Sequence, residues 1–196
     1  PGGPAKAAVV SSGIMGTVSG SAVSNVVVTG SFTIPLMKRL GYKPYFAGAV
    51  EAVASTGGQI MPPIMGAAAF IMAVIMGVSY WDVAVAAAIP AVLYYVSLYF
   101  MVHMEARKLG LVGMPRAELP KLTKVFVRRG ILIFPLIIII VVLSLGLPPS
   151  TAGFWAIVSS VAVSLLRKET RMSFSSLLGA LEEGGTSAVT VSVACA

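Results

Sequence analysis

Long stretches with little or no charge fill most of this sequence, and small polar residues interrupt two of them where a membrane helix would carry Leu or Ile. The first stretch covers residues 7–36, and Gly, Ser and Thr crowd its part from 16 to 35. The second covers 45–78 and contains Ser-Thr-Gly-Gly-Gln-Ile-Met-Pro-Pro at 55–63. Lipid cannot hydrogen-bond freed backbone groups, so irregular backbone at membrane depth survives only inside protein or beside a water-filled cavity. Paired interruptions of this kind therefore indicate the binding region of a secondary transporter.

The lengths of these stretches favour a hairpin and a broken helix. About 20 helical residues cross the hydrocarbon layer, at ~1.5 Å each. Residues 45–78 are too many for one straight span, but they would fit two half-helices joined by an unwound 55–63. The first stretch has a Gly- and Ser-rich centre, which favours a re-entrant hairpin that enters and leaves on the cytoplasmic side. A plain membrane span is the alternative for that stretch.

The same criteria divide the whole chain into segments of an all-α integral membrane protein. The expected segments are a re-entrant helical hairpin (1–43), a broken transmembrane helix with an unwound centre near 55–63 (44–80), a transmembrane helix (81–105), a basic cytoplasmic connector (106–129), two transmembrane helices (130–172), an interfacial amphipathic helix (173–183) and the start of a truncated transmembrane helix (184–196). Pro135 is expected to kink the first helix of 130–172. Because the chain begins without Met and ends in an apolar stretch, we expect an internal piece of a longer protein.

Composition and charge narrow the class of protein further. Hydrophobic residues make up 57% of the chain and charged residues 11%, which excludes an ordinary soluble domain. A net charge of +7 would suit nucleic acid, but every Lys and Arg except Lys6 falls into the clusters 38–43, 107–129 and 167–171. Two predicted spans separate each cluster from the next, so all three lie on one side, which the positive-inside rule makes cytoplasmic. We therefore expect a multi-pass protein in a lipid bilayer with no nucleic-acid partner.

The candidate binding residues are the hydroxyls and amides that gather at the two interruptions. A hard cation such as sodium prefers oxygen ligands, which hydroxyls and carbonyls released at a helix break supply without a buried carboxylate. Amino ends of half-helices that point into the same cavity would favour an anionic group. The alternative is that the small residues only allow close helix packing. The residues expected to line a substrate cavity are Ser24, Asn25, Ser55, Thr56, Gln59 and Glu51.

Glu51 is the one acidic residue well inside an apolar stretch, eight residues after Lys43. An intramembrane ionisable residue is a functional candidate by default. The alternative stays open that its carboxylate is hydrogen-bonded to a neighbouring helix or to cytoplasmic water. The sequence contains no phosphate-binding loop and no Cys and His spacing for a metal, so we expect no enzyme activity.

Several of these motifs carry a family likeness. Ser19-Gly20-Ser21-Ala22 is followed by Gly-Ser-Phe-Thr-Ile-Pro-Leu-Met at 30–37, Gly-Tyr at 41–42, Ala-Gly-Ala-Val-Glu-Ala at 47–52 and the segment 55–63. The sequence resembles the large permease subunit of TRAP transporters, the DctM-like proteins. Its Gly-Gly-Gln at 57–59 looks most like the fused 4TM/12TM permeases of the TAXI branch.

The resemblance implies a sodium-coupled, elevator-type transporter built from inverted repeats in the inner membrane of a bacterium or archaeon. Such a permease takes small organic anions, carboxylates in particular, from an extracytoplasmic TAXI-type binding protein, and works with a small membrane subunit or its fused equivalent. It uses no cofactor, with sodium as the coupling ion. The resemblance places a sodium site at Ser19, Ser21, Gly58, Met61 and Pro63.

Other functions stay as alternatives. A sodium/carboxylate symporter without a binding protein shares the plan of a hairpin and a broken helix. A channel subunit would need a continuous polar stripe, and a membrane-embedded enzyme would need a His, Asp or Cys constellation. The sequence leaves the substrate and the oligomeric state open.

Overall fold

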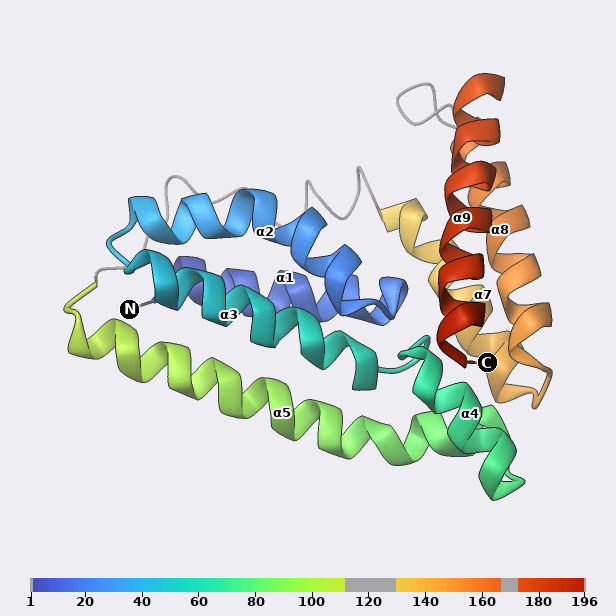
Figure 1. Ribbon diagram of the computed structural model, residues 1–196, viewed down its shortest axis with the longest axis horizontal. Helices are drawn as coiled ribbons and strands as arrows, with labels where there is room; N and C mark the ends of the chain where they lie inside the picture. The colour runs from blue at the N-terminus through green and yellow to red at the C-terminus, as the bar shows by residue number, and fades with distance from the viewer. Residues whose placement is uncertain (1, 112–129, 167–172, 196) are drawn as a thin grey trace. The chain divides into compact units, whose positions relative to one another are not determined.

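Helices make up nearly all of residues 2–111, 130–166 and 173–195, which are the residues described by the computed structural model, and these residues contain no strand (Figure 1). The all-α fold class is thus confirmed for the described part of the chain. The chain divides into two compact units, Pro1–Lys121 and Leu122–Ala196, and each is considered by itself.

The first unit begins with a helical hairpin formed by α1 (Gly3–Ser19) and α2 (Ala22–Arg39). Gly20 ends α1 in the left-handed conformation, with φ 60°, and its N–H donates to the Gly16 carbonyl over 3.1 Å. Ser21 is extended, and its Oγ accepts a hydrogen bond from the Ser24 N–H. The chain therefore reverses over two residues, Gly20 and Ser21, because Gly tolerates a positive φ and Ser caps a helix amino end. The re-entry of this hairpin into a membrane stays a prediction.

The stretch 45–78 is not one helix. It contains α3 (Pro44–Gly57), the 3-10 turn η1 (Gly58–Ile60) and α4 (Ala67–Met76). The segment 61–66 between η1 and α4 is non-helical. It holds two prolines, which lack the N–H that a continuing helix needs, and Met65, which has a φ of 55°. The unwound stretch thus begins later than predicted and extends to Gly66, because Ser55 and Thr56 still belong to α3.

The next helix, α5 (Tyr80–Lys108), has 29 residues and begins with a capping box between Ser79 and Asp82. Among the described residues it is the one helix that is both long and apolar enough to cross a membrane by itself. Three further apolar helices, α4, α7 (Phe134–Ser144) and α8 (Pro149–Leu166), are shorter than α5. A multi-pass arrangement stays a prediction.

The basic residues of the first unit gather at one end. The ring of Tyr42, in the α2–α3 connection, stacks on Phe46, and a β-carbon added at Gly41 would lie 3.0 Å from Leu111, just after α5. The ends that meet there carry Lys38, Arg39, Lys43, Arg107 and Lys108. This is the arrangement predicted for the first cluster and the start of the second. Residues 112–129 and the cluster 167–171 lie outside the described residues.

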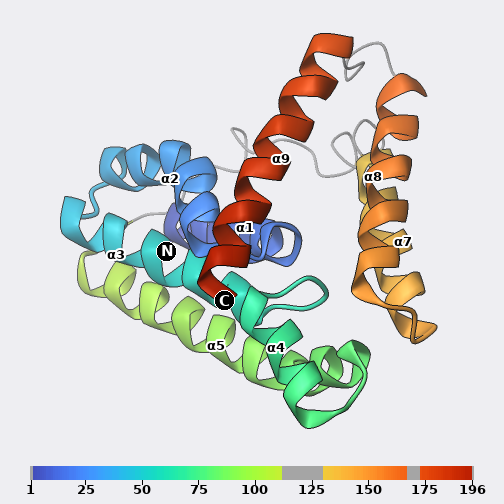
Figure 2. The ribbon, with the colours of Figure 1, turned by 45° about the vertical axis from the view of Figure 1, so that its right-hand side comes forward.

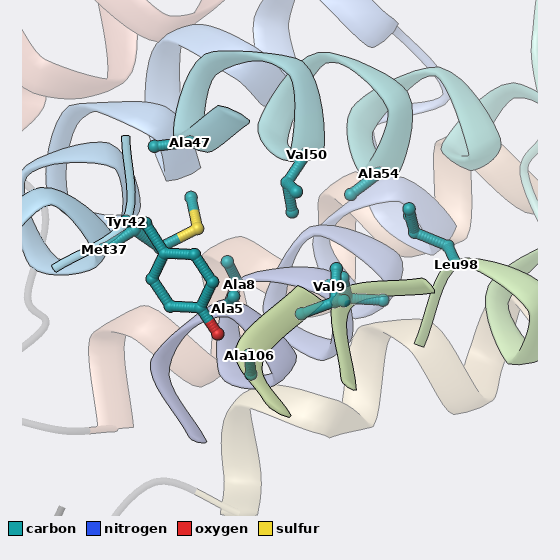
Figure 3. Close-up of a cluster of buried hydrophobic side chains, with 11 residues drawn as sticks. Ala5, Ala8, Val9, Met37, Tyr42, Ala47, Val50, Ala54, Leu98 and Ala106 are labelled. Atoms are coloured by element: carbon teal, nitrogen blue, oxygen red, sulfur yellow. The ribbon is translucent and has the colours of Figure 1, made fainter. Parts of the chain in front are cut away.

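Small side chains hold α1, α3 and α5 together (Figure 3). Because Ala and Val take little room, the helix backbones approach closely, which is the usual mode of helix packing in membranes. The buried cluster consists of Ala5, Ala8, Val9, Met37, Tyr42, Ala47, Val50, Ala54, Leu98, Val102 and Ala106. The first unit thus packs its hairpin against α3 and α5 along their lengths.

The second unit contains η3 (Gly130–Ile133), α7, α8 and α9 (Phe174–Cys195), and two predictions made for it are wrong. Pro135 does not kink a helix, because it lies in the first turn of α7, where its missing N–H costs nothing. No boundary separates an interfacial helix 173–183 from a spanning helix 184–196, because α9 is continuous across Gly184 (Figure 2). A helical Gly costs about 1 kcal/mol but does not end a helix by itself.

Candidate functional site

The tip of the hairpin packs directly against the break that follows α3. A β-carbon added at Gly16 would lie 2.5 Å from the Gly58 Cα, and one added at Gly58 would lie 2.6 Å from the Gly16 Cα. A β-carbon added at Gly20 would lie 2.0 Å from the Met65 carbonyl oxygen. The tip thus touches both sides of the break, backbone to backbone, and only glycine fits at these positions.

Tyrosines of α5 hydrogen-bond to the backbone at the break. The Gly58 N–H donates to the Ser55 and Thr56 carbonyls, so it does not reach the Ala54 carbonyl as it would in a continuing α-helix. The Tyr95 hydroxyl donates to that Ala54 carbonyl over 2.7 Å. Backbone groups freed at membrane depth must find a partner inside the protein. Tyr95 therefore stabilises the end of α3 where the sequence unwinds.

Two more tyrosines of α5 also donate hydrogen bonds to backbone carbonyls near the break. The Tyr94 hydroxyl donates to the Val53 carbonyl over 2.7 Å, and the Tyr80 hydroxyl donates to the Ile64 carbonyl, beyond η1. A β-carbon at Gly57 would lie 2.5 Å from the Tyr94 ring, so Gly57 gives the ring access to the backbone. The hydroxyls of α5 thus bond to the end of α3 and to the break that follows it.

Loss of the Tyr95 hydroxyl should destabilise the permease while the ring stays in place. We expect Tyr95→Phe to cost about 1–3 kcal/mol, the penalty for a buried carbonyl left without its donor. Thermal unfolding of a permease that contains this chain, purified in detergent, would measure the effect. The matched control is Tyr99→Phe, because the Tyr99 ring lies 4.7 Å from the Lys6 Nζ and keeps that contact without its hydroxyl. Equal changes in the two variants would contradict the role given to Tyr95.

The predicted sodium residues all lie at the contact between tip and break. Ser19 is the last residue of α1, and its Oγ is buried with no hydrogen-bond partner among the described residues. Ser21 caps α2 and is exposed. Gly58 opens η1, Met61 follows it in extended conformation, and Pro63 is buried in the break. The five residues thus belong to the hairpin tip and to the break that packs against it, with one unpartnered hydroxyl among the described residues of this region.

The six residues predicted to line a substrate cavity fall into two groups. Ser24, Thr56 and Gln59 are exposed. The Thr56 hydroxyl donates to the Ala52 carbonyl of its own helix, over 2.8 Å. The other three, Asn25, Ser55 and Glu51, are fully buried, and in this conformation they offer no surface to a solute.

Glu51 lies at the centre of a closed cluster of hydroxyl groups. Its Oε1 accepts hydrogen bonds from Ser12 over 2.6 Å, from Thr29 over 2.5 Å and from Ser55 over 3.1 Å. Its Oε2 accepts from the Thr33 hydroxyl. The structure therefore has a cluster that joins α1, α2 and α3 where the sequence predicted a cavity wall, and it bears out the alternative of a carboxylate bonded to neighbouring helices.

Sequence reasoning missed the role of Ser12 and of the tyrosines. One signal was available on α2, where Asn25, Thr29 and Thr33 are spaced by four and so share a helix face. Nothing in the sequence pairs the tyrosines of α5 with carbonyls of α3, since a backbone acceptor has no residue type.

Known proteins resemble this chain over most of its length. Residues 1–196 match the family described as "Tripartite ATP-independent periplasmic transporter, DctM component". The chain is 30% identical to the uncharacterized protein y4mL of Sinorhizobium fredii, across 84% of this chain and 39% of that protein. It is 26% identical to the uncharacterized protein YgiK of Salmonella typhimurium, across 88% and 40% respectively. It therefore spans about two fifths of the length of either relative.

A third relative matches a shorter part of the chain at a higher sequence identity. Over 63 residues the chain is 40% identical to the isethionate TRAP transporter permease protein DctMQ of Oleidesulfovibrio alaskensis, which is 32% of this chain and 10% of that protein.

The fold and the site together indicate a class of membrane protein. A helical hairpin whose tip packs against a broken helix, in a chain this apolar, is typical of membrane permeases. The chain belongs to the DctM family, the large permease component of TRAP transporters. Members of this family are inner-membrane transporter components and not enzymes, as the sequence predicted.

Proposed function

We propose that this chain forms the first ion-binding half of a sodium-coupled permease that imports small organic anions across the inner membrane. The observation that carries the proposal is the buried Ser19 hydroxyl without a partner, at the point where the hairpin tip meets the break. Sodium is a hard cation that takes hydroxyl and carbonyl oxygens. Ser19 and Ser21 supply the hydroxyl oxygens. The carbonyl oxygens come from Gly58, Met61 and Pro63.

We infer an anionic substrate from the amino end of α2, which lies at the hairpin tip. α2 begins at Ala22, next to the tip, and the amino end of a helix carries a partial positive charge. Ser24, Thr56 and Gln59 keep exposed polar groups for a solute. Small carboxylates are the substrate class proposed here. A relative named for isethionate makes an organic sulfonate a second class to test.

The proposed transport also requires partner proteins. An extracytoplasmic binding protein of the TAXI type delivers the anion, and a small membrane subunit or its fused equivalent anchors the permease in the bilayer. An inverted repeat of this hairpin and broken helix supplies the remaining ligands, and the ion-binding part moves as an elevator. A symporter that needs no binding protein is the second candidate.

The test is uptake by a permease that contains this chain, reconstituted in liposomes. We expect uptake of a carboxylate only with an inward sodium gradient and the binding protein present together. Uptake with sodium but without the binding protein would favour the second candidate. Uptake that ignores sodium would contradict the proposal, and a panel of carboxylates and sulfonates would define the substrate.

Loss of the Ser19 hydroxyl should raise the sodium requirement. We expect Ser19→Ala to raise the half-saturating sodium concentration about tenfold, which corresponds to one lost ligand of hydrogen-bond strength, about 1–2 kcal/mol. The fold should persist, because this hydroxyl has no partner among the described residues to lose. Ser31→Ala is the control, since the Ser31 hydroxyl donates only to the Val28 carbonyl of its own helix. An unchanged sodium requirement would move the cation site elsewhere.

A further inference from the structure

The carboxylate of Glu51 joins three helices at one point. Its partners are Ser12 of α1, Thr29 and Thr33 of α2 and Ser55 of α3. Glu51 belongs to α3 and is fully buried, so no water reaches the carboxylate. A buried acidic group needs a full set of hydrogen-bond donors to offset its lost hydration, and the four hydroxyls provide them.

The three hydroxyls that belong to the hairpin have a second possible partner besides Glu51. Each hydroxyl has one proton, and a second acceptor lies within its reach: the Thr29 Oγ1 is 2.7 Å from the Asn25 carbonyl oxygen, and the Thr33 Oγ1 is 2.9 Å from the Thr29 carbonyl oxygen. The Ser12 hydroxyl lies 3.0 Å from the Thr29 hydroxyl. Ser12, Thr29 and Thr33 can therefore turn to a partner within the hairpin if the carboxylate is removed. What would disappear is the set of bonds from the hairpin to α3, and the helices themselves would keep their hydrogen bonds.

The cluster connects to the hairpin tip through Asn25. The Asn25 Nδ2 donates to the Ser12 carbonyl over 2.8 Å. The same nitrogen would lie 3.6 Å from a β-carbon added at Gly16 or at Gly58. Asn25 is thus next to the point where tip and break touch, and it is fully buried. A path of direct contacts leads from Glu51 through Ser12 and Asn25 to that point.

We propose that Glu51 is a positioning residue that fastens the hairpin to α3 and so keeps Ser19 opposite the carbonyls of the break. This inference rests on the proposed sodium site and adds the residue that sets its geometry. Polar bonds fix direction and register, whereas the Ala and Val contacts between the same helices would allow them to slide. The carboxylate therefore acts on the site through the helices and does not touch the ion.

The experiment compares Glu51→Ala, Glu51→Gln and the control Ser31→Ala in a permease that contains this chain. Gln is the conservative variant, because its Oε1 can accept from Ser12 and its Nε2 can donate to Thr33, which still has the Thr29 carbonyl as acceptor. Hydrogen–deuterium exchange of the purified protein would report on the contact, and sodium-dependent uptake in liposomes would report on the site.

For Glu51→Ala we expect amide exchange in 16–21 and 58–66 to rise about tenfold, since local opening becomes easier there, while the middle of α5 keeps its protection. The half-saturating sodium concentration should rise about tenfold with the maximal rate kept, because site geometry is lost and not folded protein. Glu51→Gln and Ser31→Ala should stay within about twofold of the wild type in both measurements.

Three results would overturn the proposal. Unchanged exchange at 16–21 and 58–66 in Glu51→Ala would mean that Glu51 does not hold the tip. A lower maximal rate at an unchanged sodium requirement would mean that Glu51 serves folding only. Failure of Glu51→Gln to match the wild type would assign the effect to charge and not to position. If wild-type uptake does not need sodium, the proposed function fails, but the exchange measurement still decides the role of Glu51.

Discussion

Gly20→Ala should abolish sodium-dependent uptake. The added β-carbon would lie 2.0 Å from the Met65 carbonyl oxygen, a distance at which one backbone must move away from the other. Neither side can yield through a flexible side chain, because both groups belong to the backbone. The hairpin tip would separate from the break, and the ligands proposed for sodium would separate with it. Uptake in liposomes across a range of sodium concentrations would measure the loss.

The chain offers a matched control for this substitution. Gly77 ends α4 as Gly20 ends α1, with a φ of 65° against 60°, and no atom lies within 4 Å of a β-carbon added there. Ala in this left-handed conformation costs about 1–2 kcal/mol at either position. Gly77→Ala should therefore lower the thermal stability but keep the uptake. Equal uptake by the two variants would show that the contact with Met65 is not needed.

Replacing Pro62 and Pro63 together by Ala should also abolish uptake, at any sodium concentration. The prolines have no N–H to donate to the preceding turn, so the carbonyls of Gly58 and Gln59 stay out of an α-helical ladder. The Gln59 carbonyl accepts from the Gly66 N–H instead, over 2.8 Å. Two alanines would let the helix continue, and its ladder would consume carbonyls that the ion needs.

Pro90→Ala is the control, because Pro90 lies inside α5, a helix that stays continuous around its proline. It should keep the uptake and the sodium requirement, since the new N–H only adds a hydrogen bond to a helix that is already formed. If the double variant takes up substrate at the wild-type rate and with the wild-type sodium requirement, the role given to the prolines is contradicted.

Local signals predicted much of the fold. The turn of the hairpin falls at Gly20 and Ser21, and the chain unwinds around Pro62 and Pro63, because Gly, Ser and Pro act on the backbone of their own neighbourhood. The division of α9 was wrong for a related reason. Polar residues around Gly184 resemble a boundary, but no proline or left-handed glycine enforces one there.

The site was predicted less completely, since its contacts depend on how helices are rotated against one another. Asn25, Ser55 and Glu51 have the composition of a cavity wall, yet Ser55 bonds to Glu51 and Asn25 bonds to the Ser12 carbonyl, so all three are used inside the protein. Tyr94 and Tyr95 bind carbonyls 41 residues away, and such an acceptor leaves no trace in the sequence. Ser19 was placed from a family likeness, and the structure adds that its hydroxyl is unpartnered among the described residues.

The tyrosines of α5 also set an order for biosynthesis. α1, α2 and α3 are synthesised before Tyr94 and Tyr95, and until then the Ala54 carbonyl lacks the donor that the finished protein gives it. A bare carbonyl in lipid costs several kcal/mol. In the proposed membrane arrangement, the newly made hairpin and α3 therefore enter the hydrocarbon together with α5, once the tyrosine hydroxyls can reach these carbonyls.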